Sequence, residues 1–192
     1  MKHEAACRGN SDIVRLLLNH GADVHIIDSQ GTSPLHHAVR SLKPDVVELL
    51  VKSGADMNVR SIDNWTPLHE AADRGNFDIV RLLLSHGADG NTVDRGDSPL
   101  HQAVQSQRLD VVEHLLKGGA NVNARGCQHT TPLHHASSKG SFNMSRLLIE
   151  YGADVNAQDV RGRTPFSIAL ENGHRKLARF LSNDRVPEHD SA

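Results

Sequence analysis

The sequence predicts an all-α repeat solenoid, in which helix-turn-helix units stack on one another and β-hairpin fingers connect them. The first observation behind this prediction is a Ser/Thr-Pro-Leu-His motif that recurs about every 33 residues. Its copies occupy residues 33–36, 66–69, 98–101 and 131–134, with a variant at 164–167. The second observation is a Gly-Ala-Asp/Asn motif in the same register, which begins at Gly21, Gly54, Gly87, Gly119 and Gly152. Two motifs that keep one register indicate a repeated structural unit.

The residue types in each unit predict where its helices begin and end. Ser or Thr before Pro predicts the start of a first helix, because the hydroxyl caps a free N–H and Pro needs no donor there. A second helix follows over the apolar run at residues 13–18 and its counterparts, with Asp12 in the first turn, where the helix dipole favours an anion. The Gly of the second motif then ends this helix in the left-handed conformation. The polar segment before the next Pro forms the finger, with a tight turn expected near residues 159–162.

Together, the two motifs resemble the ankyrin repeat, and the resemblance runs from Met1 to about Leu181. It implies a single domain, residues 1–181, of six units at about residues 1–27, 28–60, 61–93, 94–125, 126–158 and 159–181. The first unit lacks its finger, which suggests a piece of a longer array. Residues 182–192 are expected to form a flexible C-terminal tail.

Some positions depart from the repeated pattern. Leu42 and Gln107 stand where a Gly turn normally joins the two helices of a unit. The finger at residues 94–96 is one residue short, and residues 126–129 replace the usual Asp-x-x-Gly turn. We expect local deviations at these fingers within a continuous stack. The last unit carries Arg175, Lys176 and Arg179, which indicates a polar C-terminal cap.

Composition excludes several classes of protein. With 38% hydrophobic and 23% charged residues, the 192-residue chain is typical of a folded soluble protein. The net charge of -2 gives no global signal for nucleic acid or membrane, and neither a secretory signal nor an apolar run of about 18 residues is found. Cys7 and Cys127 are too few for a disulfide framework, and units one and five lie too far apart to be bridged. We therefore expect an intracellular protein, cytoplasmic or nuclear.

No motif indicates an enzyme. The sequence has no phosphate-binding Gly-rich loop, no nucleophile elbow and no H-E-x-x-H, so we expect no catalysis, no cofactor and no small-molecule substrate. Five histidines share one repeat position and would recur about 10 Å apart, too far for shared coordination at about 2 Å. These are His3, His36, His69, His101 and His134. We expect them to make structural hydrogen bonds and predict no metal site.

The resemblance implies that a partner docks on the finger tips and on the inner face of the first helices. The candidate partner-binding residues are Arg40, Arg60, Ile62, Trp65, Asp73, Arg74, Arg95, Asp97, Arg125, Gln128, Lys139, Arg161 and Arg163. This surface also includes the basic Arg8 and the acidic Asp63 and Glu171, and its basic residues outnumber its acidic ones. The excess positive charge would steer an acidic or phosphorylated segment toward it. Alternatively, solvated fingers simply favour Arg. Trp65 is either the centre of binding, since interface hot spots favour Trp and Arg, or a brace for the neighbouring finger.

The leading hypothesis is a protein–protein interaction module, a monomeric scaffold or recognition part of a larger protein, with no membrane contact. One alternative is nucleic-acid binding through the basic face, although the lack of interleaved aromatic residues counts against it. Another is a purely structural spacer within a parent chain. The resemblance also implies possible targets of an asparaginyl hydroxylase, each with a Leu eight residues upstream. These targets are Asn58, Asn91, Asn123 and Asn156, unless the Asn side chains only serve the hydrogen bonding of the fingers.

Overall fold

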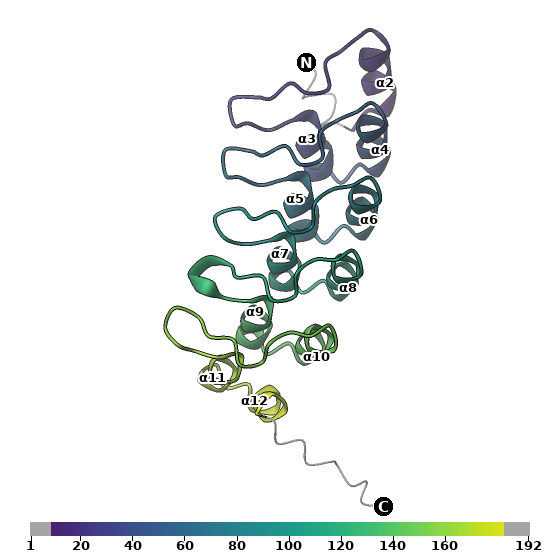
Figure 1. The fold of residues 1–192 in the computed structure, drawn as a ribbon. Coiled ribbons are helices and arrows are strands. Elements are labelled where there is room, and N and C mark those ends of the chain that lie inside the picture. The colour runs from purple at the N-terminus through teal and green to yellow at the C-terminus, as the bar shows by residue number, and fades with distance from the viewer. Residues whose placement is uncertain (1–8, 183–192) are drawn as a thin grey trace, which may run out of the picture.

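The computed structural model describes residues 9–182 as one stack of helix pairs (Figure 1). The inner helices are α3 (Pro34–Arg40), α5 (Pro67–Arg74), α7 (Pro99–Gln105), α9 (Pro132–Lys139) and α11 (Pro165–Glu171). The outer helices are α2 (Ser11–Asn19), α4 (Pro44–Lys52), α6 (Phe77–Ser85), α8 (Leu109–Lys117), α10 (Phe142–Glu150) and α12 (Arg175–Leu181). Figure 1 shows two columns of helices, with every finger projecting from the same side of the inner column. The predicted all-helical solenoid is confirmed.

The Ser/Thr-Pro-Leu-His motif starts each inner helix and also ties it to the next unit. Thr66 caps α5, and its backbone N–H donates to Nδ1 of His69 at 3.2 Å. Because Nδ1 accepts, Nε2 carries the proton, and it donates to the carbonyl of Asp97 in the next finger at 3.2 Å. The same bond to the next finger recurs from His36, His101 and His134. The predicted structural role of these four histidines is confirmed, whereas His3 lies outside the described residues.

One apolar core runs the length of the stack. The motif leucines Leu35, Leu68, Leu100 and Leu133 are all fully buried. The small residues Ala71 and Ala103 are also fully buried and let neighbouring inner helices approach closely, as between α5 and α7. Each unit buries its apolar face only against its neighbours, as expected of a solenoid.

The turns that end the helices follow the sequence. Gly54 and Gly87, after α4 and α6, have φ of 87° and 92°, the left-handed conformation in which a Cβ is strained. Between the helices of units two and four, Leu42 and Gln107 adopt φ of 54° and 59° where Gly75 of unit three has 64°. The structure thus keeps the left-handed turn at these positions even without Gly.

The β-hairpin part of the prediction is not confirmed, because no strand forms within residues 9–182. Each finger has one backbone hydrogen bond across its base, as from the Asp159 N–H to the Arg163 carbonyl at 3.0 Å, and its turn adds another. Side chains form hydrogen bonds with the backbone N–H and carbonyl groups that a strand ladder would need. The Asp159 carboxylate accepts the N–H groups of Arg161 and Arg163, and His134 donates to the Arg163 carbonyl. The tight turn predicted at residues 159–162 does form, through the bond from the Gly162 N–H to the Asp159 carbonyl.

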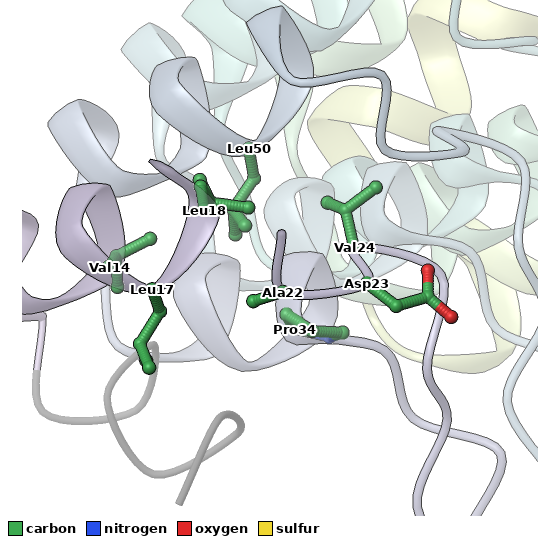
Figure 2. Close-up of a pocket in the computed structure, with 8 residues that line it drawn as sticks. All are labelled: Val14, Leu17, Leu18, Ala22, Asp23, Val24, Pro34 and Leu50. Atoms are coloured by element: carbon green, nitrogen blue, oxygen red, sulfur yellow. The ribbon is translucent and has the colours of Figure 1, made fainter. Parts of the chain in front are cut away.

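The two ends of the stack differ. At the N-terminal end, Ile13 and Leu16 of α2 are 47% and 58% exposed, whereas Ile79, the counterpart of Ile13 in α6, is fully buried. Figure 2 shows an apolar pocket beneath α2, but its space of about 20 Å³ is close to that of one water molecule. We therefore interpret it as a packing gap and not as a ligand site.

At the C-terminal end, α12 buries Leu177 and Leu181 and exposes Arg175 and Lys176. This is the arrangement expected of a polar cap. Within residues 9–182, no helix has the length and apolarity needed to cross a bilayer. Ser182, the first residue of the predicted tail, is the C-cap of α12, whereas residues 183–192, the first helix of unit one and Cys7 lie outside the described residues.

Candidate functional site

The fingers and the exposed sides of the inner helices form one face of the stack, which we call the finger face. On this face, an open groove of about 390 Å³ spans units two to four. The groove is lined by Arg40, Ser61, Asp63, Trp65, Glu70 and Arg95. Residues far apart in sequence thus form one concave site, because successive fingers lie side by side (Figure 1).

Trp65 forms part of the groove and also braces the next finger. Its side chain hydrogen-bonds the carboxyl of Asp94, which is only 8% exposed. Burial raises the pKa of Asp94, while hydrogen bonds from the Asp97 backbone and from Trp65 act to lower it. The indole is half-buried, with its ring centroid 6.2 Å from that of His69. The two roles weighed for Trp65 are therefore compatible, since a held ring can still present a face to a partner.

Glu70 organises the arginines beside the groove. Its side chain is 5% exposed, and its two carboxylate oxygens accept the Nε–H groups of Arg40 and Arg74, both at 2.9 Å. Both contacts use Nε, and the terminal Nη groups of these arginines form no hydrogen bond or ion pair within residues 9–182. A carboxylate between two guanidinium groups orients both and removes about half of their charge.

Other predicted basic residues are also neutralised in part. Arg95 pairs with Asp63 at 2.5 Å, and Arg163 pairs at 2.8 Å with Asp159, whose side chain is fully buried. Arg60 donates to the carbonyl of Val93 at 2.9 Å, which orients the guanidinium but leaves its charge in place.

By contrast, Arg125, Lys139 and Arg161 are exposed and form no ion pair with any residue of 9–182. Unpaired positive charge on the finger face therefore lies mainly from the end of unit four to unit six, although the cluster of Arg40, Arg74 and Glu70 beside the groove also keeps a net positive charge. Sequence reasoning missed the neutralising role of Glu70, although the spacing of Glu70 and Arg74 is that of an i,i+4 pair on one helix.

The remaining predicted partner-binding residues have different surroundings. Ile62 is 70% exposed at a finger tip, and Asp73 accepts a long bond of 3.4 Å from the Ser106 hydroxyl. Gln128 is exposed at a finger tip with φ of 55°. Asp97 does not point to solvent alone, because its carboxylate accepts the Cys127 N–H at 3.0 Å. It therefore links finger four to finger five.

Each predicted hydroxylation target comes four residues after the Gly that ends an outer helix, and all four are exposed. The side chains of Asn58, Asn91 and Asn123 accept backbone N–H groups of the following unit, at 3.0, 2.7 and 2.8 Å respectively. In the alternative interpretation, the Asn side chains only serve hydrogen bonding, and these three amides do form hydrogen bonds that join consecutive units. Hydroxylation itself stays a prediction.

Comparison with known families agrees with the geometry. The family model for ankyrin repeats, which spans three copies, matches residues 2–61, 43–126 and 124–190. The chain belongs to the ankyrin-repeat family. Ankyrin repeats are generally protein–protein interaction modules and are typically without catalytic activity. A search of curated proteins found no match.

Proposed function

We propose that this chain binds an extended segment of a partner protein along its finger face, with the groove at Trp65 as the centre. The groove is the observation that carries the proposal. It joins an aromatic ring to arginines that carboxylates already hold in position. Such preorganisation lowers the entropy lost on binding, and Trp and Arg are the residues that most often dominate interface energies.

The distribution of charge on the finger face indicates which residue types each part of the bound segment would carry. Around Trp65 carboxylates offset most of the arginine charge, which suits an apolar side chain flanked by polar groups. From the end of unit four to unit six, the unpaired Arg125, Lys139 and Arg161 favour acidic or phosphorylated residues. Nucleic-acid binding is less well supported, since carboxylates compensate Arg40, Arg74, Arg95 and Arg163. An exposed free thiol at Cys127 supports a reducing compartment, cytoplasm or nucleus.

Peptide display against the folded chain would provide ligands for the test. Trp65 is the only Trp, so its fluorescence reports binding at the groove directly. Selected peptides should bind a Trp65→Ala/Arg95→Ala variant at least about tenfold more weakly, as expected when a hot spot is removed; anisotropy of a labelled peptide would measure this.

A matched control is Tyr151→Ala/Arg81→Ala, which removes an exposed aromatic residue and an exposed arginine at the outer helices. Its affinity should equal that of the parent. If the groove variant binds the peptides as tightly as the control variant does, the groove is not part of the binding site. Failure to select any peptide would favour the spacer alternative.

A further inference from the structure

Three potential metal ligands converge where units four and five meet, apart from the groove. Asp97 lies at the end of finger four, His101 in α7 and His135 in α9. One ligand atom from each lies within 4.8 Å of the other two. The imidazole rings of His101 and His135 meet edge to face, with centroids 5.6 Å apart.

This combination of residue types occurs at one junction among the described units. The position of Asp97 is occupied in the other units by Thr32, Trp65, Thr130 and Arg163. The position of His135 is occupied by His37, Glu70, Gln102 and Ile168. Within residues 9–182, a carboxylate and a second imidazole place ligand atoms within 4.8 Å of a motif histidine only between units four and five. The repeat pattern itself does not require either residue.

Gly126 makes the convergence possible. Three other fingers, at Asp28, Asp94 and Asp159, have an Asp at the corresponding position. A Cβ at Gly126 would occupy the space of the Asp97 carboxylate and of His101 Nε2. The missing side chain thus lets Asp97 reach across from the preceding finger.

Both imidazoles are in the protonation state that metals bind. Burial, followed by repulsion from His101, lowers the pKa of His135 to about 4. Burial also lowers the pKa of His101. The rings are therefore neutral near pH 7, and no proton has to be displaced from the site for coordination. Asp97 and His135 are partly exposed, so an ion can reach the site from solvent.

Coordination requires one local rearrangement. His101 Nε2 now donates to the Thr130 carbonyl at 3.2 Å, and Nδ1 accepts the Ser98 N–H at 3.1 Å. When Nε2 binds a metal, its proton moves to Nδ1, where the Ser98 hydroxyl at 2.9 Å accepts it. His101 gives up two hydrogen bonds, and the site also competes with the contacts of His135 Nε2 to the Thr130 hydroxyl at 3.2 Å and of Asp97 to the Gln105 amide at 3.3 Å. The affinity is therefore lower than that of preformed four-ligand zinc sites.

We propose that Asp97, His101 and His135 form a three-ligand site for a divalent transition-metal ion. Two imidazoles and one carboxylate suit Zn²⁺, with water completing the tetrahedron. The bound ion would join units four and five and would stabilise their contact. This proposal does not depend on the partner-binding role of the finger face.

The test uses the full chain freed of metal by a chelator that is then removed. Zn²⁺ binding is measured by calorimetry and Co²⁺ binding by visible absorption. His135→Gln tests the imidazole, because unit four carries Gln102 at this position. Asp97→Asn tests the carboxylate and keeps an oxygen to accept the Cys127 N–H. His37→Gln, the equivalent change in unit two, is the control.

The parent and His37→Gln are expected to show a single-site isotherm and a Zn²⁺-dependent rise in thermal midpoint. In His135→Gln and Asp97→Asn the affinity should fall by more than about tenfold, and the rise in midpoint should disappear. Circular dichroism without metal verifies that each variant is folded. The proposal is overturned if Zn²⁺ gives no saturable binding to the parent, or if His135→Gln binds it as tightly as the parent.

Discussion

Acidification from pH 7 toward pH 4 is expected to destabilise the protein through its buried histidines. Burial lowers the pKa of His69 from 6.5 to about 4, and burial followed by repulsion from His101 does the same for His135. Because the folded-state pKa lies below the unfolded one, the unfolded chain takes up protons first as pH falls. The stabilisation is fully present above pH 6.5 and is lost as pH approaches 4.

The size of the effect follows from these shifts. A difference of 6.5 to about 4 corresponds to roughly 3 kcal/mol for each of the two histidines. Burial shifts His36, His101 and His134 in the same direction. Asp94 opposes the trend, because burial raises its pKa and the folded state then binds the proton more readily.

Asp28 titrates below this pH window. Burial would raise the pKa of Asp28, but hydrogen bonds from Thr32, His37 and Gln30 outweigh it and lower the value to about 2. The stabilisation from Asp28 is present above pH 3.8 and is lost only as pH falls further toward 2. Asp28 therefore does not contribute to the loss of stability between pH 6.5 and 4.

Urea unfolding at several pH values between 7 and 4, followed by circular dichroism with a chelator present, measures the effect. His135→Gln should lose less stability than the parent over this range, by up to roughly 3 kcal/mol. A His25→Gln variant, which changes an exposed imidazole, should retain the pH profile of the parent. If the free energy of unfolding of His135→Gln falls as steeply as that of the parent, burial of His135 does not account for the pH dependence.

Three further predictions concern packing, backbone strain and charge, and chemical unfolding measures each. Leu83→Ala should lower the free energy of unfolding by about 2–5 kcal/mol, because Leu83 is fully buried. Leu16→Ala should lower it by less than about 0.5 kcal/mol, because Leu16 is 58% exposed, and equal losses would contradict the assigned core. Leu42→Gly should stabilise the protein by about 0.5–1 kcal/mol, since φ of 54° strains a Cβ more than Gly costs in unfolded-state entropy; a loss of stability would show that no strain is relieved. Glu70→Gln should cost about 1–3 kcal/mol, because it weakens two charge-assisted bonds from arginines, and unchanged stability would show that Glu70 does not anchor them.

The repeat architecture was predictable because local contacts encode it. The N-cap and the motif histidine lie three residues apart, and the Gly that ends each outer helix acts within its own turn. Even Leu42 and Gln107, which lack the expected Gly, were recognisable from their register. The strand pairing predicted for the finger hairpins is not confirmed. Their turns form, but carboxylates and imidazoles occupy the backbone groups that a strand ladder would need.

The candidate site was predictable only in outline. Trp65 and Arg95 do line one groove, but the partner of Arg40 lies 30 residues away on the next inner helix. Counting charges along the sequence could not reveal that Glu70 compensates two arginines. The spacing argument about histidines is sound for equivalent positions, which the stacking distance separates. It did not extend to His101 and His135, which occupy different positions in neighbouring units and meet across the junction.

The sequence alone determined the helical solenoid, its register and the structural task of the motif histidines, since these depend on contacts within one turn or one repeat. Tertiary structure decided which charges remain uncompensated, which groups line the groove and which ligands meet between units four and five. The physical reason is that stacking brings together side chains about one repeat apart in the chain. Their distance and burial depend on side-chain conformations that no periodic pattern specifies.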